Sequence, residues 1–184
     1  MKEKLSFLGK VFLISLAGCL VGSVLFIAIN KAFSEAHGLL YLVAGVSTAA
    51  FYLNFIDQKK RNAATHIITD IAVIIGVFIS QLANFLICYS SMINDDVVPG
   101  RTMNAFQKTF YVYFSKGGFN KIFISDTGTP SVMTDEGSFY VWTLYVFYTI
   151  VALIGLYIIF GISKIIEIGA SPKGNRKKKG KKNK

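Results

Sequence analysis

Three polar side chains stand within long apolar stretches of this chain and are the first candidates for chemistry. Asp70 follows His66 by one helical turn, and Gln81 and Asn84 stand three residues apart further along the same stretch. Residues at this spacing share one face of a helix. A carboxylate held in an apolar environment can relay a proton or couple to an ion, and two amides can line a solute path.

Each of these groups also has a structural explanation. Asp70 falls near the start of a predicted helix, where the helix dipole stabilises a carboxylate and where the basic segment 59–61 can meet it. Gln81 and Asn84 can join neighbouring helices, each hydrogen bond contributing about 1 kcal/mol or less. The functional and the structural explanations both remain open on sequence alone.

No strong catalytic, cofactor or metal signature appears elsewhere in the sequence. Asp126-Thr127-Gly128 imitates the tripeptide of aspartic proteases, but that chemistry needs two carboxylates that share a proton, and the chain has one copy. The same three residues form a common turn. His37 and His66 are predicted on opposite sides of a membrane and cannot share a metal ion. We therefore expect no enzymatic activity, no metal and no cofactor.

Four long apolar stretches must position these residues. They cover residues 11–30, 38–56, 67–92 and 139–163, each about as long as the 20 residues with which a helix crosses the hydrocarbon core of a bilayer. Apolar residues make up 53% of the chain and charged residues only 16%. The stretches are too long for barrel strands and lack their alternation, so they are predicted to be helices. We predict an all-α integral membrane protein whose four-helix transmembrane domain covers residues 1–170.

The distribution of positive charge predicts the orientation of these helices. Most Lys and Arg residues precede the first stretch, lie at 59–61 or follow the fourth stretch, whereas the other two connections carry slightly more acid than base. Cytoplasmic segments of membrane proteins are enriched in Lys and Arg. Aromatic residues, including Trp142, gather where the fourth stretch would enter from the outer side. We expect both termini in the cytoplasm and the chain in a bacterial cytoplasmic membrane.

The connection at residues 93–138 is the longest predicted segment outside the membrane. Aromatic and apolar residues recur at helical spacing within it, opposite a polar side; they are Met103, Phe106, Phe110, Tyr113 and Phe114. We predict a structured outer loop whose short amphipathic helix lies on the membrane surface or over the mouth of the helix bundle. A short extended segment is predicted at 119–125, closed by turn residues.

Small residues at four-residue spacing mark three of the four apolar stretches. The principal ones are Gly18, Gly22, Gly45, Ala49, Gly76 and Ser80. In lipid, helices associate by close van der Waals approach, and small residues permit it. These seams predict either a compact bundle within one chain or one seam left over for a partner, which is another membrane protein or a second copy of the chain.

The first stretch also contains Leu16-Ala17-Gly18-Cys19, which has the form of a bacterial lipoprotein cleavage site. Apolar sequence continues without a break to Ile29, whereas a mature lipoprotein turns polar directly after its cysteine. We therefore favour an uncleaved helix and leave processing open. Cys19 and Cys88 are predicted at different depths, so both are interpreted as small packing residues and not as a disulfide.

The segment 171–184 is strongly basic and contains almost nothing that can be buried. We predict a disordered cytoplasmic tail that contacts anionic lipid headgroups, through Arg176, Lys177, Lys178, Lys179, Lys181 and Lys182. A basic tail can also serve only as a topology signal, and we do not expect nucleic acid as its partner.

Two hypotheses of function remain. The first is a small non-enzymatic accessory, assembly or immunity-type subunit that binds another membrane component through a helix seam or the outer loop. The alternative is a small oligomeric transporter or channel with a polar path past Asp70, Gln81 and Asn84.

Overall fold

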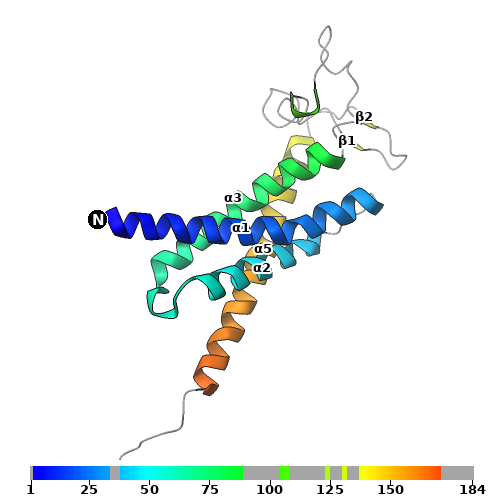
Figure 1. Ribbon diagram of the computed structural model, residues 1–184. Helices are drawn as coiled ribbons and strands as arrows, with labels where there is room; N and C mark the ends of the chain where they lie inside the picture. Colours follow the sequence, from blue (N-terminus) through cyan, green and yellow to red (C-terminus); the bar gives the residue numbers. More distant parts are fainter. Residues whose placement is uncertain are drawn as a thin grey trace, which may run out of the picture.

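The computed structural model describes residues 2–33, 38–88, 104–107, 123–124, 130–131 and 137–170. Its long helices are α1 (Lys2–Phe33), α2 (Tyr41–Phe55), α3 (Ala63–Cys88) and α5 (Gly137–Ala170), as Figure 1 shows. Single 3-10 turns, η1 (Gly38–Leu40) and η2 (Gln58–Lys60), precede α2 and α3. The strands β1 (Phe123–Ile124) and β2 (Pro130–Ser131) form one short antiparallel pair.

Four helices of the described structure are long and apolar enough to cross a membrane. Their apolar parts cover Glu3–Ala32, Gly38–Phe55, Ala63–Cys88 and Tyr145–Glu167. Many of their large apolar side chains are exposed, including Leu13, Ile67 and Ile150, as expected where the solvent is lipid. The prediction of four helices that can span a membrane is therefore confirmed, and it places the chain in contact with a lipid bilayer.

The helices extend beyond the predicted apolar stretches at several ends. α1 already begins at Lys2 and α5 continues to Ala170, so both helices include charged residues outside their most apolar part. Lys and Glu are good helix formers, and their side chains reach the polar headgroup region from a helix end. Hydropathy marks only the part of a helix that lies in hydrocarbon, and the helix itself is longer.

The four helices pack in a ring. α1 packs against α2 and α3, and α5 packs extensively against α2 and less extensively against α3. The C-terminal part of α5 runs clear of the other helices in Figure 1, and Ile165 and Ile166 there are 70% and 63% exposed. Among the described residues, this end of α5 therefore has few neighbours.

α1 and α3 run in the same direction and meet in constant register. Ser15 hydrogen-bonds Thr69 at 3.1 Å, and Asn30 donates to Asn84 at 2.8 Å, both pairs 54 residues apart in sequence. The Cys19 thiol, which lies between these pairs, faces the Val73 carbonyl at the same separation of 54 residues. An unchanged offset over four turns means that the two helices stay in contact from Ser15 to Asn30 of α1.

Aromatic rings fill the space between α1, α2 and α5. The rings of Phe26 and Tyr41 have centroids 4.5 Å apart, and Tyr41 stacks on Tyr148 at 4.9 Å. A second apolar cluster joins Val11 with Tyr52 at the opposite end of the bundle. The two clusters place a packed layer near each end of the helices, with the hydroxyl and amide pairs between α1 and α3 running alongside.

Most of the predicted outer loop and the whole basic tail lie outside the described residues. Within the predicted amphipathic helix, residues 104–107 are described: the Asn104 amide donates to the Gln107 side chain and the Gln107 amide donates to the Asn104 side chain. This reciprocal pair is the geometry of a helix start. The rest of that helix remains a prediction, whereas β1 lies within the extended segment predicted at 119–125.

Candidate functional site

Asp70 is joined to α5 by a short hydrogen bond. The Tyr157 hydroxyl donates to Asp70 Oδ2 at 2.7 Å. Asp70 Oδ1 is buried and has no hydrogen-bond partner in the described structure. A carboxylate oxygen without a donor is costly in an apolar surrounding, so this oxygen is a candidate for contact with a proton, an ion or a group that the described chain does not supply.

His66 does not complete a proton relay with Asp70 in this structure. Its ring packs against the Tyr52 ring, with centroids 5.3 Å apart, and meets the edge of the Phe160 ring at 4.9 Å. Within the described residues no hydrogen bond joins His66 to Asp70. The two side chains share a face of α3 as their spacing predicts, but the observed contacts of the imidazole are those of a packing residue.

The amide pair predicted on α3 has two different environments. Asn84 Oδ1 accepts from Asn30 Nδ2 at 2.8 Å and from the Cys88 thiol at 3.4 Å. Gln81 is 7% exposed, and its Nε2 has no partner in the described part of the chain. Asn84 is therefore a link between α1 and α3, whereas Gln81 retains an unmet donor.

Hydroxyl groups form further links between helices, and of the residues involved only Ser80 was marked by the sequence, as a small seam residue. Three buried pairs run along the bundle: Ser15 with Thr69, Tyr41 with Ser80, and Tyr52 with Thr65. Hydrogen bonds of this kind between membrane helices contribute about 0.6 kcal/mol on average and up to about 1.7 kcal/mol. Ser, Thr and Tyr scarcely lower the hydropathy of a stretch, so the available signal was their helical spacing on α3, which places them on one side.

Arg61 holds the connection between α2 and α3 against the end of α2. Its Nε donates to the Ile56 carbonyl at 3.0 Å and its Nη2 donates to the Leu53 carbonyl at 2.6 Å. These carbonyls belong to the last turn of a helix, which lacks donors of its own. Arg61 Nη1 also lies 3.9 Å from the Glu167 carboxylate. Arg61 was one of three cations of the segment 59–61 that could have met Asp70, but its observed contacts are with α2 and α5.

Lys31 plays a comparable part at the other end of the bundle. Its ammonium donates to the Ile87 carbonyl at 3.1 Å, in the last turn of α3. The donor comes from α1, so the contact joins two helices while it satisfies a carbonyl that has no donor within its own helix. The two cations show that at least part of the positive charge at the helix ends has a structural role.

The small residues on the predicted seams face other helices of the same chain. An ideal Cβ on Gly22 would lie 2.5 Å from Ala44 Cα, and one on Gly76 would lie 2.7 Å from Cys19 Sγ. Gly45 faces the backbone of Ala152 so closely that a Cβ would overlap its carbonyl oxygen.

The remaining seam residues are also enclosed. An ideal Cβ on Gly18 would lie 2.9 Å from Thr48 Cα. Ala49 and Ser80 are both buried. All six seam residues thus lie at contacts within the bundle, and no seam among the described helices is left open as a whole.

The described residues form neither a metal-binding cluster nor a disulfide. No group of three or more His, Cys, Asp or Glu side chains gathers there to hold a metal ion. Cys19 and Cys88 are both free and buried.

The chain matches no known protein family, no curated protein and no solved structure.

Proposed function

We propose that this protein is a small non-enzymatic accessory, assembly or immunity-type subunit that binds another component of its membrane. The observation that supports this proposal best is the pairing of polar groups between helices. The amide and hydroxyl pairs that join α1 to α3 and α2 to α3 satisfy one another. Groups that are bonded in this way hold helices together and do not line a watery path.

A binding subunit needs a stable scaffold and an accessible outer surface. The small-residue seams are used for contacts within the chain, so we place the partner contact on the outer loop, residues 93–138, or on the lipid-facing surface. The C-terminal part of α5 is a prominent part of that surface, because its isoleucines are exposed and it projects beyond the bundle (Figure 1). The partner class that we propose for this surface is a second membrane protein, because the surface belongs to the apolar part of α5.

The proposed orientation has both termini in the cytoplasm of a bacterial cell. It rests on the concentration of Lys and Arg before α1, between α2 and α3, and after α5. The basic tail then lies against the anionic inner leaflet, where each cation contributes roughly 1 kcal/mol. A reporter fused after Lys184 tests this directly: activity restricted to cytoplasmic reporters is expected, and activity of an exported reporter would refute the orientation.

Co-purification tests the proposed function. The full chain, tagged and extracted from native membranes in mild detergent, should bring down another membrane protein in a fixed ratio. Asp70→Asn should leave that recovery unchanged, because the proposal assigns no chemistry to the carboxylate. Recovery of the chain without any partner, together with flux through the purified protein, would overturn the proposal.

A small oligomeric transporter or channel is the second candidate, and one specific observation favours it. Asp70 Oδ1 and Gln81 Nε2 are buried polar atoms without partners in the described structure, and such groups inside a membrane commonly mark solute or ion pathways. The purified chain in liposomes should then support flux that Asp70→Asn abolishes. Asn54→Ala is the matched control, because Asn54 is exposed and its amide donates to Ala50 of its own helix.

A further inference from the structure

A cavity of about 330 Å³ opens where η2 and the start of α3 meet the C-terminal part of α5. Its polar lining includes Gln58, Arg61, Ser163 and Lys164, and the rings of Tyr52 and Phe160 contribute an apolar wall. The described hydrogen bonds and ion pairs of this region do not involve the Lys164 ammonium or the Ser163 hydroxyl. The cavity thus combines one fixed cation, one cation with no partner in the described chain, the imidazole of His66, the carboxylate of Glu167 and neutral donors.

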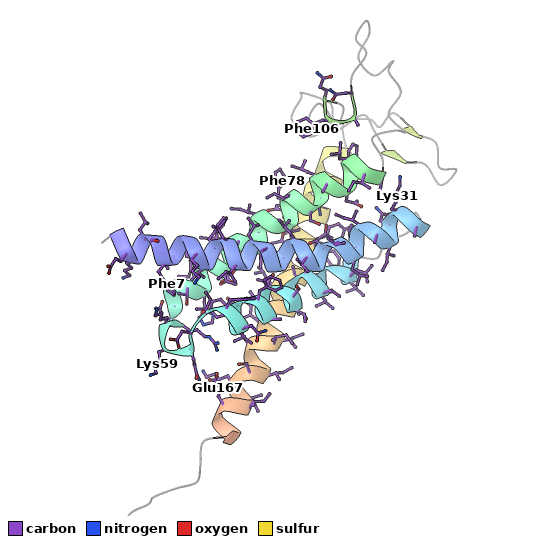
Figure 2. The ribbon with its side chains drawn as sticks, viewed as in Figure 1. Phe7, Lys31, Lys59, Phe78, Phe106 and Glu167 are labelled. Atoms are coloured by element: carbon purple, nitrogen blue, oxygen red, sulfur yellow. The ribbon has the colours of Figure 1, made fainter. Side chains whose placement is uncertain are left out.

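The cavity lies where the apolar parts of α3 and α5 end, which is the depth expected for lipid headgroups. The apolar part of α5 ends at Glu167 and that of α3 begins at Ala63, and the cavity is lined from both of these ends. Figure 2 shows Lys59 of η2 and Glu167 of α5 at the same end of the bundle. Phosphate groups of a bilayer lie at this boundary between hydrocarbon and water.

The charges at the cavity favour an anion. Among the residues that line it, Arg61 and Lys164 carry positive charge, against the single carboxylate of Glu167. That carboxylate lies 3.9 Å from Arg61 Nη1, so the guanidinium offsets part of its charge. The Arg61 side chain is already fixed by its bonds to α2, and a fixed donor loses little freedom when it binds a ligand.

We propose that this cavity binds the phosphate of an anionic phospholipid from the adjoining leaflet. The ammonium of Lys164 and Arg61 Nη1, the guanidinium nitrogen that is not bonded to α2, contact the phosphate oxygens, and Gln58 and Ser163 supply neutral donors. The aromatic wall faces the glycerol end of the acyl chains, which continue into the bilayer. The site is separate from the basic tail and does not depend on which partner or solute the protein serves.

Binding at this cavity links two parts of the chain that otherwise meet sparingly. The phosphate bridges the α2–α3 connection and the C-terminal part of α5, which projects from the bundle. A ligand that binds only the folded arrangement stabilises it by mass action. The lipid therefore fixes the direction in which this end of α5 leaves the bundle.

Thermal unfolding of the full chain in mixed micelles tests the proposal. Phosphatidylglycerol added in increasing mole fraction should raise the unfolding temperature, whereas diacylglycerol with the same acyl chains and inorganic phosphate at equal concentration should not. Lys164→Gln should require about tenfold more phosphatidylglycerol for the same shift, as expected for one charged hydrogen bond. Lys59→Gln removes an exposed cation of η2 that does not line the cavity. This variant should respond to phosphatidylglycerol as the original chain does.

The outcomes separate a built site from general charge attraction, because the basic tail is present in every variant. Equal losses in Lys164→Gln and Lys59→Gln would overturn the proposal in favour of unspecific attraction. An equal shift with diacylglycerol would exclude headgroup recognition, and an equal shift with inorganic phosphate would exclude the lipid as the ligand. Lys164→Arg keeps the charge and should retain binding; if it fails as Lys164→Gln does, the effect is structural and the proposal is wrong.

Discussion

The contact between α2 and α5 should fail when a single methyl group is added at Gly45. An ideal Cβ at this position would overlap the carbonyl oxygen of Ala152 and would lie 2.7 Å from the backbone nitrogen of Leu156. Both atoms belong to the backbone, so no side-chain rotation can make room. The two helices must therefore move apart along the face on which they are packed.

The expected magnitude follows from two opposing effects. Overpacking of a close contact costs about 1–3 kcal/mol, and a clash with backbone belongs at the upper end of that range. Alanine regains about 1 kcal/mol over glycine as a helix former. Gly45→Ala should therefore lower the free energy of unfolding by about 2 kcal/mol. Gly161 of the same α5 has open space around it, so Gly161→Ala should raise stability by about 1 kcal/mol or less.

Unfolding in mixed micelles, with the fraction of sodium dodecyl sulfate increased stepwise and helicity followed by circular dichroism, measures both changes. The two alanine variants should shift the midpoint in opposite directions. The close approach of α2 to α5 would be refuted if Gly45→Ala unfolded at the same detergent fraction as the original chain or moved together with Gly161→Ala.

Three further predictions concern the polar contacts. A double-mutant cycle of Asn30→Ala and Asn84→Ala should give a coupling energy between about 0.6 and 1.7 kcal/mol, measured by the same unfolding assay; additive effects would show that the two amides are not bonded. Arg61→Met should cost about 2 kcal/mol because two carbonyls of α2 lose a charged donor, whereas Lys59→Met should change stability by less than about 0.5 kcal/mol. Cys19, fully buried against α3, should resist a membrane-permeant maleimide until the protein is unfolded, and rapid labelling of the folded chain would contradict its placement.

The presence and rough position of the spanning helices follow from hydropathy alone, because lipid leaves no alternative to a helix for long apolar segments. Their pairing does not follow. Gly22 and Gly76 are the same residue type, yet Gly22 contacts the backbone of α2 and Gly76 contacts Cys19 of α1. A small residue predicts that something approaches closely, and only the three-dimensional arrangement of all four helices determines what approaches.

The partner of Asp70 shows a second limit of prediction. The sequence draws attention to residues within a helical turn or to the nearest basic segment, whereas the observed donor is Tyr157, 87 residues away. Such a contact depends on how α5 crosses α3, which no local spacing encodes. The register between α1 and α3 was more open to prediction from sequence. Polar residues 54 positions apart recur along both helices, so the two helical sequences could have been aligned directly.

The two candidate functions differ most in the role that they give to the polar groups of α3 that lack hydrogen-bond partners in the described structure. The side of α3 that faces α1 and α2 carries bonded hydroxyls and amides, so a path through that side would have to break several hydrogen bonds at once. Asp70 Oδ1 and Gln81 Nε2 instead lack partners in the described structure, and Asp70 meets α5 through the hydroxyl of Tyr157. A transporter would satisfy these two atoms with water or a passing ion, whereas the accessory-subunit hypothesis assigns them no role. The transporter hypothesis therefore depends on the surroundings of Asp70 and Gln81, and the amides and hydroxyls bonded to α1 and α2 belong to the scaffold in either case.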